Sequence, residues 1–297
     1  MTEPSGYGLE PIREGADFTF YRGRQHGNPS PILAIALSAK QPSPQSLRRL
    51  EHEYTLASEL DPAWAATPLA LTRHEGRTTL VLKDPGGELL DQVLEQHQGQ
   101  PLDLTRFLCV AIGLASALGH VHRRGLIHKD IKPANALVDE AGNVWLIGFG
   151  IASRLPREHQ SPVPLEIIAG SLAYLAPEQT GRMNRSMDAR SDLYSLGVTL
   201  YQMLTGDLPF AAADPLEWVH CHIAREPVSP AERAAVPEPL SSLIMKLLAK
   251  NAEERYQTAS GLEADLRRCL AQWQSDGRID AFPLGAHDAS DRLLIPE

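Results

Sequence analysis

The pattern of apolar residues along the chain changes at Pro85-Gly86-Gly87. Before this point, short runs of β-branched, aromatic and aliphatic residues, bounded by Gly, Pro or charged residues, predict strands. These runs are Phe18–Tyr21, Ile32–Leu37 and Thr78–Leu82. Helical spacing is confined to one segment between them, marked by Leu47, Leu50, Tyr54 and Ala57. The first part of the chain is therefore expected to form a small β-rich region with one main helix.

Beyond this change, apolar residues recur at intervals of three and four, which is typical of buried helices. The clearest stripe runs from Leu104 to Leu118. A second runs from Leu193 to Leu204 and ends at Gly206, a residue that favours a helix stop. Further helices are expected at Pro215–Ala224, Leu240–Leu248 and Ala259–Leu270. The second part of the chain is therefore expected to be a larger helical region.

These patterns predict two lobes of unequal size. The expected boundaries are a β-rich lobe over residues 7–83, a hinge over 84–87, a helical lobe over 88–273 and a linker or tail over 274–297. Proline followed by two glycines suits a hinge because these residues interrupt both strands and helices. The composition after about Asp276 predicts an extended tail. The abrupt end of the chain suggests a further domain in a longer protein.

Composition limits the classes of function. The chain of 297 residues carries 28 Lys and Arg against 37 Asp and Glu, a formal charge of −9. Nucleic-acid binders concentrate positive charge, so no nucleic-acid partner is expected. Cys109, Cys221 and Cys269 form no C-x-x-C pair, which favours reduced thiols and a cytoplasmic location. The longest mostly apolar segment, Phe107–Leu118, is shorter than the roughly 20 residues that span a bilayer, so no membrane segment is expected.

The stretch from His128 to Asn135 has the residues of a phosphoryl-transfer loop. Asp130 is followed by Lys132 two residues later and by Asn135 five residues later. In such a loop the Asp accepts the proton of the substrate hydroxyl, the Lys neutralises a phosphate oxygen and the Asn holds a metal ion. The sequence therefore predicts Asp130, Lys132 and Asn135 as catalytic residues, whether active or vestigial.

With this loop, the Gly-Gly hinge and the two kinds of lobe, the chain resembles the protein kinase family over roughly Tyr7–Trp273. Three further features follow in the family's order, Ala176-Pro177-Glu178, Ser191–Gly197 and Arg255. The spacing of Lys132 resembles serine/threonine kinases rather than tyrosine kinases. The resemblance implies an α+β, bilobal protein kinase fold with a β-rich N-lobe and a helical C-lobe.

The resemblance also implies roles for individual residues. The residues expected to bind ATP are Gly15, Leu82, Asp84 and Asn135, and Asn135 is also expected to hold Mg²⁺ weakly. The activation segment would contain Gly148, Ser171 and Glu178. The structural residues would be Glu53 on the N-lobe helix, Asp192, which ties down the catalytic loop, and Arg255, which pairs with Glu178.

The sequence departs from the family's pattern at the nucleotide clamp. Where the family has a metal-binding Asp before Phe-Gly, this chain has Gly148. Where the family's third strand carries a Lys, this chain has Ala36, or Ile35 if the alignment shifts by one residue. Glu53, the partner of that Lys, is therefore expected to lack its cation. Of three family glycines in the phosphate-binding loop, Gly15 alone is present, which hinders close backbone approach to phosphates.

Two interpretations of these departures stay open. In the first, the chain is a pseudokinase-type signalling module with little or no phosphotransfer. In the second, it is an active noncanonical serine/threonine protein kinase, in which Arg13, Arg22 or Arg24 replaces the missing Lys. A small-molecule phosphotransferase is a third candidate, which the Ala176–Glu178 and Ser191–Gly197 segments disfavour.

Two segments resemble a narrower group. Gly181–Ser186 and Gly277–Glu297 are similar to the N-terminal kinase-like region of large bacterial hybrid sensor histidine kinases, which belong to two-component systems. This resemblance implies protein partners, or downstream ATPase and sensor domains of a longer chain.

The stretch His220-Cys221-His222 has residue types that bind metals. No second ligand cluster at zinc spacing accompanies it, so a helix face near the surface is favoured.

Overall fold

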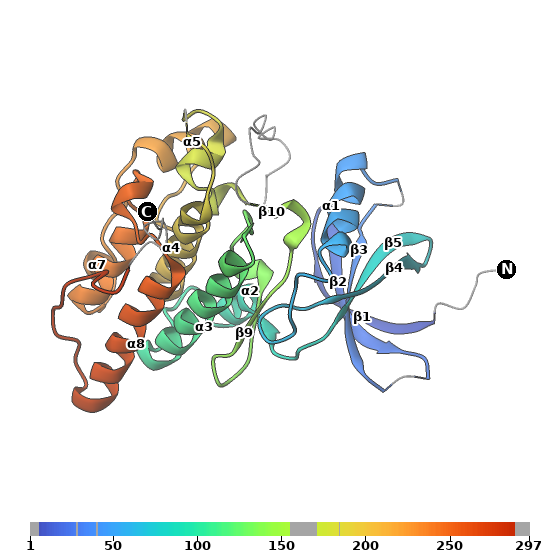
Figure 1. Ribbon diagram of the computed structural model, residues 1–297, viewed down its shortest axis with the longest axis horizontal. Coiled ribbons are helices and arrows are strands. Elements are labelled where there is room, and N and C mark those ends of the chain that lie inside the picture. Colours follow the sequence, from blue (N-terminus) through green and yellow to red (C-terminus); the bar gives the residue numbers. More distant parts are fainter. Residues whose placement is uncertain (1–5, 28, 40, 155–170, 184, 289–297) are drawn as a thin grey trace, which may run out of the picture. The chain divides into compact units, whose positions relative to one another are not determined.

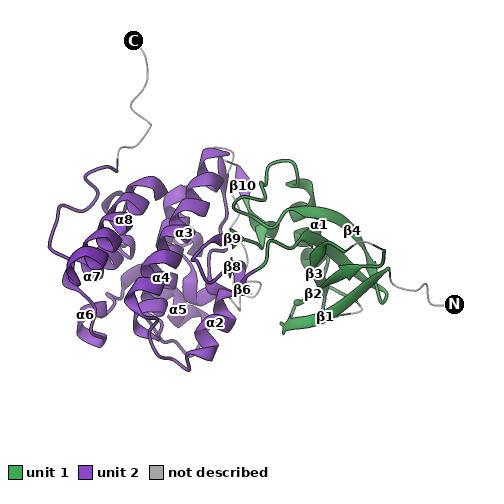
Figure 2. Cartoon of the chain, turned by 90° about the horizontal axis from the view of Figure 1, so that it is seen from below, with its two compact units in different colours: residues 1–86, 145–152 green, residues 87–144, 153–297 purple. Residues whose placement is uncertain are grey.

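The computed structural model describes residues 6–27, 29–39, 41–154, 171–183 and 185–288. Figure 1 follows the chain through its helices and strands. The chain divides into two compact units, coloured separately in Figure 2. Unit 1 comprises residues 1–86 and 145–152, and unit 2 comprises residues 87–144 and 153–297. Each unit is described by itself.

Unit 1 contains a five-stranded antiparallel sheet in the order β1-β2-β3-β5-β4. The strands are β1 (Tyr7–Glu14), β2 (Phe18–Gln25), β3 (Pro31–Leu37), β4 (Pro68–His74) and β5 (Arg77–Lys83). Every residue of β3 from Ile32 to Leu37 is buried, because this central strand is covered on both faces. The three predicted strands are confirmed. The runs in β1 and β4 are polar and contain proline, and they gave no clear strand signal.

The single helix of this unit is α1 (Pro44–Thr55). It begins where Pro44 supplies a pre-set backbone angle in the first turn and the Ser43 side chain accepts a hydrogen bond from the Ser46 N–H. Its buried face contains Leu50 and Glu53. Unit 1 is thus the predicted β-rich region with one main helix.

Unit 2 is mainly helical. Its helices are α2 (Leu90–Gln96), α3 (Leu104–Arg123), α4 (Ala189–Thr205), α5 (Pro215–Ala224), α6 (Pro230–Arg233), α7 (Glu238–Leu247) and α8 (Ala259–Asp276). Short strands are β6 (Glu88–Leu89), which pairs with β8 (Ala136–Val138), and β7 (Leu126–Ile127), which pairs with β10 (Ser153–Arg154). A further short strand, β9 (Val144–Leu146), straddles the division between the units.

The core of unit 2 is built around α3 and α4. α3 packs against α4 and α8, and α4 is buried continuously from Ser191 to Tyr201. α4 ends at Gly206, whose φ of 79° lies in the left-handed region, as the predicted helix stop requires. The predicted stripe from Leu104 extends further than expected, to Arg123.

Among the described residues, α3 is the one helix that is long and apolar enough to cross a membrane. The sequence indicated an apolar segment too short for this, but the helix has 20 residues and a mean hydropathy of 1.6 over an 18-residue window. Of that window, 61% is buried inside the protein, which is the pattern of a core helix.

The expectation of an extended tail is wrong for residues 277–288. α8 continues to Asp276, and the chain after it folds back onto unit 2. The Asp288 carboxylate accepts a hydrogen bond from the Thr258 N–H at 2.8 Å, and the Gly285 N–H donates to Asp265 at 2.7 Å. Ile279 is buried. The helical unit therefore includes these residues, while residues 289–297 of the predicted tail lie outside the described residues.

Candidate functional site

The loop between β7 and β8 is held by one buried carboxylate. Asp192, near the start of α4, accepts hydrogen bonds from the backbone N–H groups of His128 at 2.8 Å and Lys129 at 2.7 Å. His122, in the last turn of α3, contacts the same carboxylate at 3.0 Å. Lys129 has a φ of 68°, a backbone angle that a side chain disfavours, so this anchoring stabilises a strained turn. The geometry is the one predicted for Asp192, whereas the contact from His122 was not predicted.

Asp130 lies directly after this turn and is surrounded by donors. Lys132 Nζ lies 2.9 Å from both of its carboxylate oxygens, and the Ser171 hydroxyl donates to Oδ1 at 2.6 Å. The Asn135 amide donates to Oδ2 at 2.9 Å and to the Asp130 backbone carbonyl at 2.8 Å. Neither of these bonds uses Asn135 Oδ1, which is the atom that can bind a metal ion. The structure therefore brings Asp130, Lys132, Asn135 and Ser171 together.

The electrostatics of this cluster favour an ionised Asp130. Burial acts to raise the pKa of its carboxyl group, but the positive charge of Lys132 and the hydrogen bonds from Ser171 and Lys132 outweigh burial and hold the pKa below its ordinary value. An ionised carboxylate with three side-chain donors on its oxygens can accept a hydroxyl proton, or it can order the loop.

A second buried pair supports the end of the predicted activation segment. Arg255 binds Glu178 through two parallel bonds of 2.8 and 3.0 Å, and both side chains are almost completely buried. The other guanidinium N–H groups of Arg255 donate to the carbonyls of Ala249, Arg190 and Lys250. Ser191 donates to Glu178 at 2.7 Å. This is the pairing that the resemblance implied for Arg255 and Glu178.

The position of the missing lysine lies in the buried centre of the unit 1 sheet. Ala36 on β3 pairs with Thr19 on β2 and with Thr79 on β5, and all three are buried. Residues directly opposite one another in an antiparallel pair place their side chains on the same face. On that face Ala36 is thus flanked by Thr19 and Thr79.

The three arginines proposed to replace the lysine lie on the other face. Arg22 and Arg24 pair with Leu33 and Pro31, and Arg13 pairs with Phe20, which in turn pairs with Ile35. Each of these β3 residues is an odd number of positions from Ala36, and side chains alternate between faces along a strand. With Ala36 at the lysine position, none of the three arginines shares its face.

If Ile35 held that position instead, the three arginines would share its face, but two of them are already engaged. The Arg13 guanidinium lies over the Phe20 ring at 4.2 Å from its centre. Arg22 Nε lies 2.7 Å from Asp84 Oδ2, in an ion pair whose carboxylate is 3% exposed. Among the described residues of the five strands, the cations that share the face of Ala36 are Lys83, paired with Ile32, and Arg77, two residues from Thr79 on β5.

Glu53 has a hydrogen-bond donor in place of a lysine. The backbone N–H of Gly148, at the position of the family's metal-binding Asp, donates to Glu53 Oε1 at 3.1 Å. Gly148 has a φ of 80°, in the left-handed region that glycine adopts without strain. A neutral backbone group therefore contacts the buried Glu53 carboxylate.

The loop that should approach phosphates is closed on itself. The Gly15 N–H donates to the Phe18 carbonyl at 3.0 Å, and a Cβ atom added at Gly15 would lie 2.9 Å from that oxygen. The Ser38 hydroxyl donates to the Gly15 carbonyl at 2.8 Å. Glycine is thus needed here for a tight β1–β2 turn, and its amide is used within that turn.

The other two residues predicted to contact ATP sit at the end of β5. Leu82 is fully buried between its strand neighbours Leu33 and Pro68. Asp84 binds Arg22 and also accepts the Gly86 N–H at 2.9 Å, so its side chain orders the start of the hinge. The Arg22–Asp84 pair was missed by sequence reasoning because 62 residues separate its members.

The residues present do not fit a firmly held Mg²⁺. This ion is usually bound through one or two carboxylates together with substrate phosphates. Asn135 offers an amide oxygen, and the position of the expected carboxylate is Gly148. No group of three or more His, Cys, Asp or Glu side chains that could hold a metal ion occurs in the described part of the chain.

The predicted surface position of His222 is wrong. Its ring is completely buried, stacks on Trp218 and contacts the Tyr194 hydroxyl at 3.0 Å and the Leu172 carbonyl at 2.8 Å. Burial lowers the pKa of His222 to about 4; the bond to Leu172 acts against this shift and nearby Lys250 adds to it. The ring is therefore a neutral packing element between α5, α4 and the segment before Glu178.

Comparison with known proteins agrees with these features. The family model of the protein kinase domain matches residues 28–266. Serine/threonine-protein kinase PknB of Mycolicibacterium smegmatis is 38% identical over 173 residues, which are 58% of this chain and 27% of that protein. A probable serine/threonine-protein kinase of Streptomyces coelicolor, SCO3848, is 34% identical over 209 residues, which are 70% of this chain and 29% of that protein. PksC of the same species is 36% identical over 192 residues, covering 64% of this chain and 34% of that protein. The chain thus spans about a third or less of the length of these relatives.

Proposed function

This chain belongs to the protein kinase domain family, and from that membership we propose that it is a serine/threonine-kinase-like domain impaired in phosphotransfer, which acts as a binding module in signalling. The bacterial serine/threonine kinases among its relatives support the narrower class. The lost charges of the nucleotide clamp support the impairment.

The observation that carries this proposal is the pair Ala36 and Gly148. An active kinase needs both the strand lysine paired with the helix glutamate and the Asp that holds Mg²⁺. Here Ala36 lies between two threonines, and Gly148 offers Glu53 a backbone N–H. A metal clamp stabilises developing charge by several kcal/mol, and each 1.36 kcal/mol is tenfold in rate, so losing both groups is expected to cost several orders of magnitude, roughly.

The intact cluster around Asp130 fits a structural duty as well as a catalytic one. Its carboxylate binds Lys132, Ser171 and Asn135, which joins the catalytic loop to the activation segment. Such a loop can present a fixed surface to a partner without turning over ATP. ATP binding, with Mg²⁺ weakly held at Asn135, remains part of the proposal as a ligand rather than a substrate.

The direct test is transfer of the ATP γ-phosphate to the chain itself and to a generic protein acceptor, with Mg²⁺ and with Mn²⁺. The expected result is no transfer above that of Asp130→Asn. The double variant Ala36→Lys with Gly148→Asp is the matched control, since it restores both charges. The proposal would be wrong if the unaltered chain transferred phosphate robustly and Asp130→Asn abolished that transfer.

The active noncanonical kinase is the second candidate. It needs a cation on the face of Ala36, which favours Arg77 or Lys83 over the arginines of β1 and β2. It predicts saturable, ATP-dependent thermal stabilisation that weakens in Arg77→Met or Lys83→Met and persists in Arg24→Met. Absence of any nucleotide-dependent shift, with or without divalent ions, removes this candidate.

We further propose that the chain works in the cytoplasm with protein partners, or with ATPase and sensor domains of a longer two-component protein. The three cysteines are free thiols, as a reducing compartment favours. The resemblance of Gly181–Ser186 and Gly277–Glu297 to hybrid sensor histidine kinases supports the second kind of partner. Pull-down of the native protein from its own cells with antibody to this chain, followed by peptide mass analysis, would reveal such domains. Recovery of a protein that ends with this chain would contradict them.

A further inference from the structure

The chain after α8, residues 277–288, runs back along that helix toward its start, and we call this segment the strap. The Asp280 N–H donates to the Gln272 side chain at 3.1 Å. Closer to the start of the helix, the Arg268 guanidinium lies over the Phe282 ring at 4.4 Å from its centre. The strap is therefore packed along α8.

The strap ends in a hook, formed by Gly285 and Asp288. The Asp288 N–H donates to the Gly285 carbonyl at 3.0 Å, and Gly285 has a φ of 75°, in the left-handed region that favours glycine. The Gly285 N–H donates to Asp265 Oδ2 at 2.7 Å, and the same oxygen accepts the Tyr256 hydroxyl at 2.6 Å. Asp265 and Tyr256 are both buried. The hook is thus held by a buried carboxylate of α8.

The Asp288 carboxylate lies on the first turn of α8. It accepts hydrogen bonds from the Thr258 N–H at 2.8 Å, from the Thr258 hydroxyl at 2.7 Å and from the Gln257 N–H. Backbone N–H groups at the start of a helix lack partners within the helix, and the helix dipole favours a negative charge there. The fit is close, because a Cβ atom added at Gly261 would lie 2.5 Å from Asp288 Oδ1 and 2.7 Å from its Cα. Glycine at this position therefore leaves room for the strap.

Gln257 connects the hook to the loop that carries Arg255. Its side-chain amide donates to the Arg255 carbonyl at 2.8 Å, and its Oε1 accepts a hydrogen bond from Arg190 at 2.9 Å. Arg255 in turn donates to the Arg190 carbonyl and binds Glu178 through two bonds. The backbone of Gln257 is thus bound by Asp288, while its side chain supports the Arg255–Glu178 pair.

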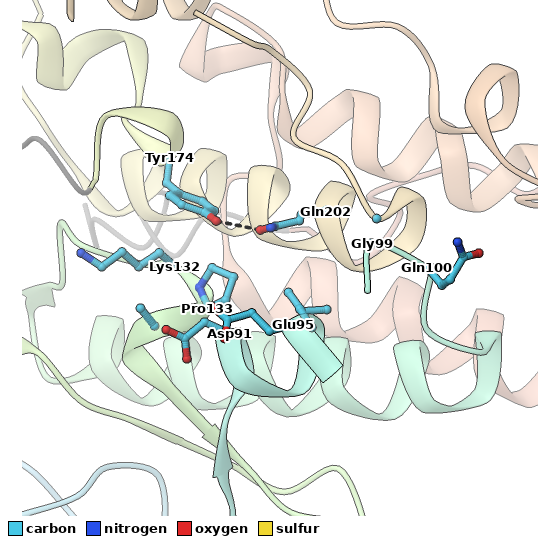
Figure 3. A pocket seen from close by; sticks show the side chains of 11 residues that line it. Asp91, Glu95, Gly99, Gln100, Lys132, Pro133, Tyr174 and Gln202 are labelled. Carbon is cyan, nitrogen blue, oxygen red and sulfur yellow. Dashed lines mark hydrogen bonds between the residues drawn. The ribbon is translucent and has the colours of Figure 1, made fainter. Parts of the chain in front are cut away.

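A separate bond holds the segment before Glu178. The Tyr174 hydroxyl donates to Gln202 Oε1 of α4 at 2.7 Å, at a pocket of about 370 Å³ beside the catalytic loop (Figure 3). This bond joins the segment directly to α4. It therefore provides a reference contact for the same segment that does not pass through Gln257.

From these contacts we infer that the strap is a latch on the end of the activation segment. While Asp288 is bound at the start of α8, Gln257 holds the Arg255 loop in the form that binds Glu178. When Asp288 leaves, Gln257 loses the bond that fixes its backbone, and the Arg255–Glu178 pair loosens. Coupling of this kind needs an element with two states that both sites bias, and the bound and released strap are those states. The inference goes beyond the proposed function and holds whether or not the chain transfers phosphate.

The test is amide hydrogen exchange of the whole chain, measured by mass spectrometry. Two variants release the hook by different means. Asp288→Ala removes the carboxylate, whereas Gly261→Ala places a methyl group where Asp288 lies, although Ala favours a helix more than Gly does. Asp280→Ala, at an exposed position of the same strap, is the matched control.

Exchange in residues 177–182 and 251–257 is expected to be about tenfold faster in both Asp288→Ala and Gly261→Ala, because hydrogen bonds to a charged carboxylate are lost. The control should change it by less than about twofold, and α3 should keep its rate in every variant. Adding Gln257→Ala to Asp288→Ala should add little, since both interrupt the same connection. Adding Tyr174→Phe should add its own full effect, because it acts through another contact.

Four outcomes would each overturn the inference. Faster exchange confined to the first turn of α8 would show that Asp288 only caps the helix, and an equal increase in α3 would show that the whole unit is destabilised. Equal effects of Asp288→Ala and Asp280→Ala, or an unchanged rate in Gly261→Ala, would show that the hook is not the element that matters. Thermal unfolding of each variant checks that it is folded.

Discussion

The two units of this chain differ in which of the charged residues typical of protein kinases they contain. Unit 2 retains a connected set around Asp130, Asp192 and Glu178, in which each carboxylate contacts several donors. Unit 1 has Ala36 and Gly148 at positions where the family places an ammonium group and a carboxylate. Unit 2 therefore has the family's charged residues at these positions, whereas unit 1 lacks two of them.

The difference follows from what each group does for the fold. Removing Asp192 or Arg255 leaves buried donors or a buried charge without partners, which strongly destabilises a protein. Ala36 leaves no buried donor or charge without a partner, because its small apolar side chain lies between Thr19 and Thr79 in the sheet. If phosphotransfer is impaired, as we propose, the residues that support folding are the ones that would be retained.

The largest loss of stability is expected from Arg255→Ala in unit 2. It leaves the Glu178 carboxylate buried without its cation, and the expected loss in free energy of unfolding is about 3–5 kcal/mol. Urea unfolding measures it. Glu253→Gln is the control, because Glu253 pairs with Arg185 on the surface and its loss should change the stability far less. Similar losses in the two variants would show that the buried pair has no special role.

A pH-dependent loss of stability is expected from His222. The unfolded chain binds a proton at the ordinary pKa of about 6.5, whereas the folded ring does so at about 4. Stability from neutral His222 is therefore complete above pH 6.5 and declines as the pH falls toward 4, by about 3 kcal/mol in total. His222→Gln should flatten this decline, and His220→Gln, an exposed neighbour, should leave it unchanged. An equal slope in both variants would contradict the assignment.

Asp192→Asn tests the anchor of the catalytic loop. The variant keeps the shape but removes the charge that accepts bonds from His128, Lys129 and His122, and we expect a loss of about 2 kcal/mol. Chemical denaturation measures the loss, with Asp276→Asn at the exposed end of α8 as the control. A change within error of the control would mean that the loop holds its strained turn without this carboxylate.

The smallest effect is expected in unit 1. Arg22→Met breaks the pair with Asp84, but Arg22 is 34% exposed, so the expected loss is about 1 kcal/mol or less. Arg24→Met, at an exposed position on the same strand, provides the baseline. If Arg22→Met lost as much stability as Arg255→Ala, the proposed difference between the two units would be wrong.

Much of the fold and of the catalytic loop was predictable from the sequence. Apolar residues recur regularly over the whole length of α3 and α4, so these helices could be predicted. Motifs such as Asp130-x-Lys132 indicate the chemistry because their residues lie within one loop. The strands with prolines and polar residues, β1 and β4, were missed because their pattern depends on the neighbours that they pair with. The tail after Asp276 was misjudged because polar composition does not reveal that the Asp288 carboxylate binds the backbone of Thr258, 30 residues earlier at the start of α8.

The sequence by itself determined that this chain has the kinase elements in order and lacks two charges of the nucleotide clamp, since those facts depend on residue identity and spacing. The tertiary structure alone decided that Arg13, Arg22 and Arg24 lie on the face opposite Ala36, that Glu53 meets a backbone N–H and that His222 is buried. Sheet register, and packing between segments far apart in the chain, place side chains on one face or another. No local pattern of residues encodes that choice.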